Sequence, residues 1–280
     1  MDTFGIVGAG IMGSDLAMFF AESGYRVLLN DRDPNRLDAA REKIHERLSS
    51  YERRGRLDAA RMADLESRVK CAPTLAEFAR ADIVIECVTE DLETKKGVFA
   101  ELDGICRPGV VLASNTSSKS ITAIAAATRR PESVIGLHFM NPVRAMRLVE
   151  IICGLATTRE TFETAKQIVK KAGKEYVESR DYPGFIANRI LMPMINEAIF
   201  ALYEGAGTVE AIDKVMKLGM NQPMGPLELA DMVGLDIVLA ILDELYRGFG
   251  DTKYRPCPLL KKYVAAGYLG KKSGRGFYTY

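Results

Sequence analysis

Two histidines occur among the 280 residues, and histidine is the side chain whose ordinary pKa suits proton transfer near neutral pH. His45 lies within a charged, helix-like segment. His138 instead follows a short apolar run, residues 134–137, of the kind that forms a buried strand. Folds that alternate strands and helices place their chemistry at strand ends. We therefore expect His138 to be the candidate acid or base.

A carboxylate partner for this imidazole follows within the same predicted hairpin. Asn141 and Pro142 indicate a turn, and residues 147–152 form a second strand-like run. If the two runs pair about a centre at Arg144, His138 lies opposite Glu150, with about 5 Å between Cβ atoms. Such a carboxylate would fix the tautomer of the ring and stabilise imidazolium, as a general base requires. A buried histidine that is merely hydrogen-bonded to a structural acid is the alternative.

The N-terminal segment has the pattern of a nucleotide-binding turn. A short apolar strand, residues 4–7, runs directly into Gly8-Ala9-Gly10-Ile11-Met12-Gly13, and a helix follows. Gly8 permits a tight turn, Gly10 lets the backbone approach a pyrophosphate, and Gly13 allows the helix to pack closely on the strand. A second strand, residues 25–29, leads to an acid at Asp31. The whole arrangement predicts a dinucleotide site.

Asp31 also bears on which dinucleotide binds. Its carboxylate would accept hydrogen bonds from the adenosine ribose hydroxyls and would repel a 2′-phosphate, which favours NAD. The neighbouring Arg32 could accommodate that phosphate, so NADP remains open at this stage.

The remainder of the first half alternates strands and helices, with one insertion. Residues 36–68 are typical of a helical hairpin that breaks near Gly55, with a basic cluster at its bend: Arg53, Arg54 and Arg56. Buried strands are predicted at 82–88 and 110–113. The polar loop 114–118 follows the second of these strands, and loops at this place line the crevice in which dinucleotides bind. A further helix is predicted over 158–172.

Beyond a predicted boundary at 181–184, helical patterns replace strand patterns. Helices are expected at 185–203, 208–219, 226–247 and 257–267, and the surplus of apolar side chains suggests a homodimer. The expected fold class is α/β: a Rossmann-like doubly wound sheet with a helical-hairpin insertion, followed by an all-helical domain. The predicted domains are an NAD-binding domain, residues 1–183, and a helical substrate and dimerisation domain, residues 184–280.

Composition excludes several other functions. The net charge of +1 argues against nucleic acid and acidic membrane surfaces as partners, and the sequence contains no apolar run long enough to span a membrane. Five cysteines are scattered without CxxC spacing, which indicates reduced thiols in the cytoplasm and no metal site.

Several motifs resemble the L-3-hydroxyacyl-CoA dehydrogenase family, in particular its short, single-function 3-hydroxybutyryl-CoA dehydrogenases. The resemblance covers essentially the whole chain. It rests on GIVGAGIMG (5–13), SNTSS (114–118), GLHFMNP (136–142), LVEII (148–152), DYPGFIANR (181–189), PMGPLELADMVGLD (223–236) and GKKSGRGFY (270–278). The glycine motif is common to many families, whereas HFMNP with LVE and GFIANR is far more specific.

The resemblance implies a role for individual residues. His138 would be the base that removes the 3-hydroxyl proton of the substrate, with Glu150 as its orienting partner. Ser117 and Asn188 would contact the acyl-CoA substrate at the reacting centre, and Arg54 in the hairpin would contact coenzyme A. Positions that contact NAD in this family are matched by Gly8, Gly10, Ile11, Met12, Gly13, Asp31, Glu90, Lys95, Asn115, Ser117, Asn141 and Lys272.

Two other functions remain possible from the sequence. One is a sugar-acid 3-dehydrogenase of the gulonate type, which shares the fold and the histidine–glutamate pair. The other is a non-catalytic NAD-binding protein, although a silent binding module would not need the pair of His138 and Glu150.

Overall fold

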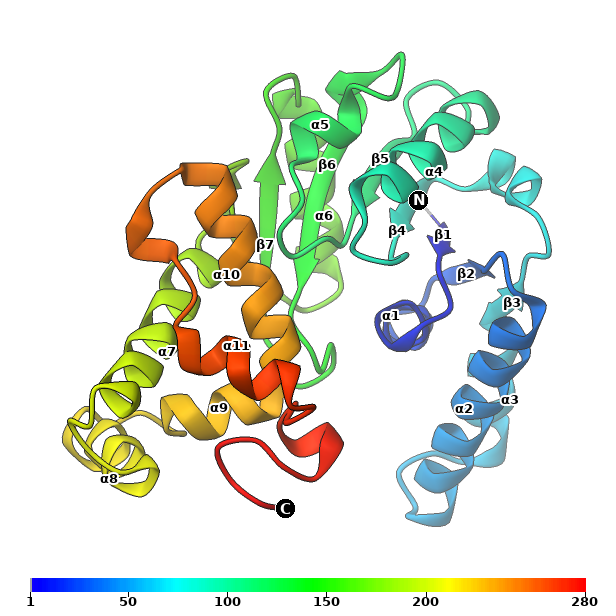
Figure 1. Ribbon diagram of the computed structural model, residues 1–280. Helices are drawn as coiled ribbons and strands as arrows, with labels where there is room; N and C mark the ends of the chain where they lie inside the picture. Colours follow the sequence, from blue (N-terminus) through cyan, green and yellow to red (C-terminus); the bar gives the residue numbers. More distant parts are fainter. Residues whose placement is uncertain (1) are drawn as a thin grey trace. The chain divides into compact units, whose positions relative to one another are not determined.

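The computed structural model describes residues 2–280, and the chain divides into two compact units, one up to Tyr182 and one from Pro183 (Figure 1). The first unit is built on a mixed β-sheet and the second is helical. The α/β fold class predicted from the sequence is confirmed.

The sheet of the first unit has eight strands within the described residues, in the order β3-β2-β1-β4-β5-β6-β7-β8. Their bounds are β1 (Thr3–Val7), β2 (Arg26–Asn30), β3 (Val69–Cys71), β4 (Ile83–Glu86), β5 (Val111–Ser114), β6 (Val134–Phe139), β7 (Leu148–Cys153) and β8 (Glu175–Arg180). Strands β1 to β6 are parallel, β7 runs antiparallel to β6, and β8 runs parallel to β7. The carboxyl ends of the parallel strands therefore share one edge, where ligands bind in such folds.

Helices cover both faces of this sheet. They are α1 (Ile11–Glu22), α2 (Pro34–Arg53), α3 (Ala59–Arg68), α4 (Leu92–Ile105), α5 (Ile121–Ala125) and α6 (Arg159–Lys171). Side chains of α1 and α6 join Phe4 of β1 in one core cluster, in which Phe4 stacks on Phe20 with 4.3 Å between ring centroids. Gly136 of β6 faces the opposite side, because strand residues alternate, and it lies against Ile121 of α5.

The predicted helical hairpin is formed by α2 and α3. Asp33 accepts a hydrogen bond from the backbone of Asn35 and so caps α2, and Gly55 takes a positive φ of 66° in the turn. Ile44 and Leu48 lie on the buried face of α2 and form a small core with Leu65 of α3 and Met18 of α1. In Figure 1 the hairpin, coloured blue to cyan, extends from the part of the sheet that carries β3.

Two strands, β3 and β8, have no counterpart among the predicted elements. β8 lies at the edge of the sheet, and most of its side chains are exposed or half-buried, so its sequence lacks the alternation that would reveal a strand. Its pairing with β7 nevertheless extends from Glu175 to Arg180. Tertiary pairing, and not local pattern, determines this element.

The second unit packs its helices around a separate apolar core. They are α7 (Ala187–Tyr203), α8 (Val209–Lys214) with a π-helical turn (Val215–Gly219), α9 (Pro226–Val233), α10 (Leu235–Phe249) and α11 (Pro258–Ala265). The core includes Ile195 and Ile199 of α7 and Leu242 and Leu245 of α10. Across residues 2–280, no helix has both the length and the apolar character that a membrane span requires.

The prediction of one helix over 226–247 was wrong. Gly234 adopts a φ of +102°, which no helix accommodates, and it separates α9 from α10.

The buried Asp231 of α9 accepts backbone hydrogen bonds from Phe277 and Tyr278, so the C-terminal segment docks on this helix.

Leu48→Ala should lower the free energy of unfolding by about 2–5 kcal/mol, because it opens a cavity between α2 and α3. The substituted side chain is 1% exposed. Urea denaturation followed by circular dichroism measures the change. Leu155→Ala is the matched control, since Leu155 belongs to the same unit and is 90% exposed. Equal stability of the two variants would contradict this packing.

Candidate active site

His138 and Glu150 form a buried pair between β6 and β7. The antiparallel register places them directly opposite, as predicted, and Nδ1 of His138 lies 2.7 Å from Oε2 of Glu150. His138 is 8% exposed and Glu150 is 1% exposed. A hydrogen bond of this length to a carboxylate places a proton on Nδ1 and fixes the plane of the ring.

Asn115 connects the loop after β5 to the strand that carries the histidine. Its Oδ1 accepts a hydrogen bond of 3.0 Å from the backbone N–H of Phe139, the residue after His138. The resemblance assigned Asn115 to the cofactor alone. The structure shows in addition that this side chain holds the end of β6 in place.

The glycine turn after β1 has the shape that a dinucleotide requires. Gly8 has a φ of +100°, and a Cβ on Gly13 would lie 1.7 Å from the carbonyl oxygen of Gly8. At Gly10, by contrast, nothing within residues 2–280 beyond the adjacent backbone lies within 4 Å of the place that a Cβ would take. Helix α1 starts at Ile11, so its N-terminal N–H groups lie beside this open space. The residues present therefore fit the pyrophosphate of a dinucleotide.

Asp31 lies directly after β2 and holds this turn. Its Oδ2 accepts a hydrogen bond from the backbone of Ala9 at 2.8 Å, and its Oδ1 accepts one from the backbone of Asp33 at 3.0 Å. The side chain is buried, with 8% of the residue exposed. Because a carboxylate offers about four lone-pair sites, Asp31 retains capacity for ribose hydroxyls.

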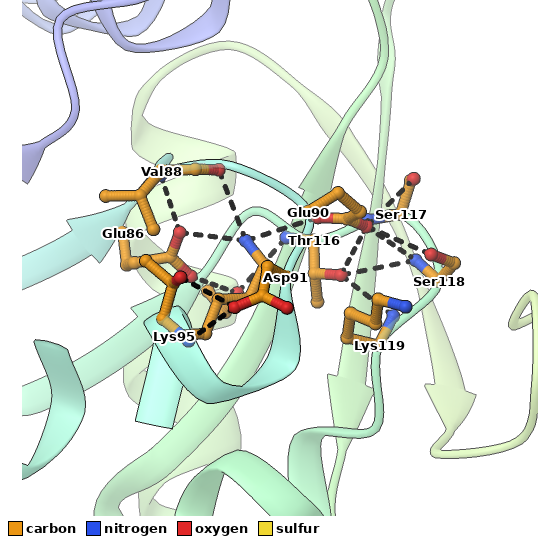
Figure 2. Close-up of polar contacts among 11 residues, drawn as sticks. Glu86, Val88, Glu90, Asp91, Lys95, Thr116, Ser117, Ser118 and Lys119 are labelled. Carbon is orange, nitrogen blue, oxygen red and sulfur yellow. Dashed lines mark hydrogen bonds and ion pairs between the residues drawn. The ribbon is translucent and has the colours of Figure 1, made fainter. Parts of the chain in front are cut away.

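Glu90 organises the polar loop after β5 (Figure 2). Its Oε1 accepts hydrogen bonds from the hydroxyl of Thr116 at 2.6 Å and from the backbone and hydroxyl groups of Ser117 and Ser118 at 2.9–3.2 Å. Partial burial opposes ionisation, but Lys95 and these donors outweigh it and lower the pKa of Glu90. The hydroxyl groups of this loop are thus gathered around one carboxylate.

Lys95 lies behind Glu90 in a fully buried position. Its ammonium is 2.8 Å from Oε1 of Glu86 and 3.2 Å from Oε2 of Glu90. Burial alone would lower the pKa of Lys95, but the two carboxylates raise it above its usual value. The sequence shows Glu86 only as part of an apolar strand and does not by itself assign it to the site. An acid inside such a run is itself a signal, because a buried charge needs a partner.

The other predicted site residues lie elsewhere in the two units. Asn141 is exposed after β6 and precedes a cis peptide bond to Pro142, and Arg54 is exposed at the end of α2. In the second unit, Asn188 is buried in the first turn of α7, and Lys272 forms an ion pair of 2.6 Å with Asp236.

The first unit thus assembles most of the predicted residues at one edge of its sheet. A carboxylate-bound imidazole can exchange a proton with a hydroxyl or carbonyl oxygen, and the glycine turn provides for a dinucleotide. Over residues 2–280, no group of three or more histidine, cysteine, aspartate or glutamate side chains is placed to hold a metal ion.

Comparison with known proteins identifies both units. Residues 3–182 match the family model described as 3-hydroxyacyl-CoA dehydrogenase, NAD binding domain, and residues 184–280 match the model of the C-terminal domain of that enzyme. A probable 3-hydroxybutyryl-CoA dehydrogenase of Bacillus subtilis is 52% identical over 98% of this chain and 96% of its own length. A 3-hydroxybutyryl-CoA dehydrogenase of Bradyrhizobium diazoefficiens is 51% identical over 99% of this chain and 94% of its own length. The crystal structure of the (S)-3-hydroxybutyryl-CoA dehydrogenase of Ralstonia eutropha covers 100% of this chain and 99% of its own, with a TM-score of 0.96 and 44% identity.

Gly10→Ala should affect binding of the cofactor, whereas Gly13→Ala should affect the stability of the fold. Gly10 has an ordinary φ of −69° and open space around it, so the Gly10→Ala protein should melt like the wild type yet bind NADH more weakly. The Gly13→Ala protein should lose thermal stability, because its methyl group meets a backbone carbonyl. Differential scanning fluorimetry and NADH fluorescence titration measure the two effects. Wild-type NADH affinity in Gly10→Ala would exclude this turn as the cofactor site.

Proposed function

The chain belongs to the 3-hydroxyacyl-CoA dehydrogenase family, and from this membership we propose that it interconverts (S)-3-hydroxybutyryl-CoA and acetoacetyl-CoA with NAD. The observation that carries the chemistry is the buried pair of His138 and Glu150, 2.7 Å apart. The four-carbon acyl group is supported by the two relatives named as 3-hydroxybutyryl-CoA dehydrogenases, which are 52% and 51% identical to this chain over nearly its whole length.

In this proposal the histidine handles the proton of the reaction. NAD, when bound at the glycine turn, would supply the acceptor for the hydride that leaves C3 of the substrate. Nε2 of His138 takes the proton of the 3-hydroxyl group, so that the C–O bond becomes a carbonyl and the ring becomes imidazolium. The ionised carboxylate of Glu150, already bonded to Nδ1, stabilises that positive charge. In the reductive direction the imidazolium returns the proton to the same oxygen.

We assign the other residues around this centre. Ser117 and Asn188 contact the substrate near C3, and Asn141 and Lys272 contact the cofactor. Arg54 contacts a phosphate of coenzyme A. This last assignment is supported by the exposed basic cluster of Arg53, Arg54 and Arg56 at the bend of the hairpin, because arginine binds phosphate in a bidentate manner.

The two alternatives to this reaction are less well supported. The family models that match both units are those of the 3-hydroxyacyl-CoA dehydrogenases. A silent nucleotide-binding protein would gain nothing from burying a carboxylate against an imidazole, because burial of ionisable groups costs stability. The oxidation of NADH followed by its absorbance distinguishes all three, with acetoacetyl-CoA, free acetoacetate and the keto form of gulonate as substrates in turn. Turnover of the sugar acid alone would overturn the proposal.

His138→Gln should lower kcat by about 10²–10⁴-fold, the usual contribution of general acid–base catalysis. Glu150→Gln should also lower kcat, because it removes the charge that stabilises imidazolium while keeping a side chain of the same shape. NADH should bind both variants as it binds the wild type. Stopped-flow assays with acetoacetyl-CoA and NADH fluorescence give the two quantities. Near-normal kcat in His138→Gln would refute the assigned role.

We further propose that the protein functions as a homodimer through its second unit. A hollow on that unit is lined mostly by apolar side chains of α7, α8 and the π-helical turn, including Ala201, Ile212 and Met216, with Glu197 as a charged residue among them. Val215, which also lines it, is 58% exposed, and Leu218 in the same turn is 76% exposed. Exposed apolar surface of this kind is typical of subunit contacts.

Val215→Asp should convert the dimer to a monomer, because dimerisation would then bury an unpaired charge. Light scattering coupled to size-exclusion chromatography measures the mass. Leu155→Asp, at an exposed apolar position of the first unit, is the control and should leave the mass unchanged. A dimer in both variants would exclude this surface.

For location we propose the cytoplasm, which is supported by the state of the thiols. All five cysteines are free thiols. Burial raises the pKa of Cys106 and of Cys153 to about 11, which disfavours the reactive thiolate form. Reduced thiols of this kind are typical of a reducing compartment.

A further inference from the structure

We propose that Arg144 and Tyr51 are positioning residues, which hold the basic cluster of the α2–α3 hairpin at a fixed place relative to His138. Arg144 lies in the turn between β6 and β7, and Tyr51 lies in the last turn of α2. This inference rests on the proposed function, because it takes Arg54 of the basic cluster to bind coenzyme A.

The turn between β6 and β7 is fixed by hydrogen bonds to its backbone. Within the turn, the N–H groups of Ala145 and Met146 both donate to the carbonyl oxygen of Pro142 at 3.1 Å. From outside the turn, the ammonium of Lys174 donates to the carbonyl oxygens of Val143 and Met146. Lys174 is 8% exposed, and it directly precedes β8. The turn is therefore a firm base for a side chain that reaches out from it.

The side chain of Arg144 extends from this turn to two helices. Its guanidinium carbon lies 4.9 Å from the centroid of the Tyr51 ring of α2, and its Nη1 donates to the hydroxyl of Tyr51. The same nitrogen lies 3.2 Å from Oε1 of Glu22 in α1. Burial raises the pKa of Glu22, and Arg144 is the foremost of the charges that oppose this rise. The aromatic ring and the partly buried acid therefore both favour the guanidinium in this place.

Tyr51 joins this contact to the exposed bend of the hairpin. It packs against the small core that α1, α2 and α3 share. Its carbonyl oxygen accepts the N–H of Arg56 at 2.9 Å, and the guanidinium carbon of Arg56 lies 6.0 Å from its ring centroid. The residues from Arg53 to Arg56 are all exposed. Because segments with few buried contacts are the most mobile parts of a fold, we expect the bend to depend on Tyr51 for its position.

A fixed distance between the basic cluster and His138 matters because one substrate molecule must occupy both places. In the proposed reaction the coenzyme A part binds at the cluster while C3 of the acyl group lies at the histidine. Binding energy from the remote part can then serve to align the reacting carbon. A misplacement of about 1 Å can reduce a rate by about 10²-fold. The contact between Tyr51 and Arg144 joins the two places, because the strands on either side of the turn carry the imidazole and its carboxylate.

The first test measures the hairpin in the protein without cofactor or substrate. In Arg144→Ala, hydrogen–deuterium exchange of the peptide covering residues 50–58 should become about fivefold or more faster than in the wild type. The matched control is Arg147→Ala, because Arg147 is an exposed arginine at the other end of the same turn. Its peptide should exchange like that of the wild type. Unchanged exchange in Arg144→Ala would overturn the proposal whether or not the enzyme acts on acetoacetyl-CoA.

A second variant tests the contact from the side of the helix. Tyr51→Phe keeps the ring that packs against the small core and removes only the hydroxyl that accepts from Arg144. Its peptide should exchange faster than that of the wild type and slower than that of Arg144→Ala. In the Arg144→Ala background the same change should have no further effect, because the hydroxyl has already lost its partner. A full additional effect in that background would contradict the pairing.

Steady-state kinetics with two substrates separate positioning from general damage to the site. Acetoacetyl-CoA carries the nucleotide that the basic cluster would bind, whereas the thioester of acetoacetate with N-acetylcysteamine lacks it. In Arg144→Ala, kcat/KM should fall about tenfold or more for acetoacetyl-CoA and stay within about twofold of the wild type for the thioester. An equal loss with both substrates would indicate damage to the pair of His138 and Glu150, and no loss with either would show that the contact has no part in binding. Each of these two results overturns the proposal.

A mutant cycle separates positioning from direct contact with coenzyme A. The second change is Arg53→Ala/Arg54→Ala/Arg56→Ala, which removes the guanidinium groups of the basic cluster. If Arg144 acts through the cluster, Arg144→Ala should add little to the loss of kcat/KM for acetoacetyl-CoA that these changes cause. If Arg144 contacts coenzyme A itself, the two losses should multiply, and multiplication refutes the proposal.

Discussion

A carboxylate that folding removes wholly or partly from water has to find hydrogen-bond donors, and this constraint organises the edge of the sheet. Each acid holds a different segment: Asp31 holds the glycine turn, Glu90 the polar loop and Glu150 the imidazole, while Glu86 anchors the ammonium of Lys95. The acids lie on or shortly after the strands β2, β4 and β7, whose mutual register the sheet fixes. The glycine turn and the polar loop are thereby hydrogen-bonded to acids that the sheet holds in place.

The central pair could be predicted because hairpin register is simple arithmetic. The strand patterns on either side of Asn141 and Pro142 centre on Arg144, and the structure pairs His138 with Glu150 as that centre requires. The glycine turn and the α2–α3 hairpin were predictable for a similar reason, because their signals are local. The edge strand β8 was not predictable, since its side chains face solvent in large part and its backbone pairing with β7 defines it.

The site was harder to predict where one residue acts through another. Sequence motifs supplied Glu90, Lys95 and Asn115 as separate cofactor positions, but contacts across 24 to 28 residues join Glu90 to the loop and Asn115 to Phe139. No local pattern records such contacts. Glu86 is the most deeply buried of these acids. It was not predicted as a site residue, because it lies within an apolar run that indicates only a buried strand, and its partner Lys95 lies on the next helix.

In the second unit, too, buried carboxylates hold other segments in place by accepting their hydrogen bonds. Asp231 accepts the backbone N–H groups of Phe277 and Tyr278, and Asp213 caps the start of α9 through Leu227 while it also accepts the hydroxyl of Tyr278. Burial raises the pKa of Asp231, and these backbone donors offset the rise only in part.

The folded state therefore binds a proton at Asp231 more tightly than the unfolded chain does. Stability from this group is greatest in acid, below the pKa of the unfolded chain, and declines as pH rises through the raised pKa of the folded state. Burial of the ionised carboxylate of Asp231 is unfavourable. The C-terminal segment that carries Lys272 docks on it nevertheless, because the backbone N–H groups of that segment require an acceptor.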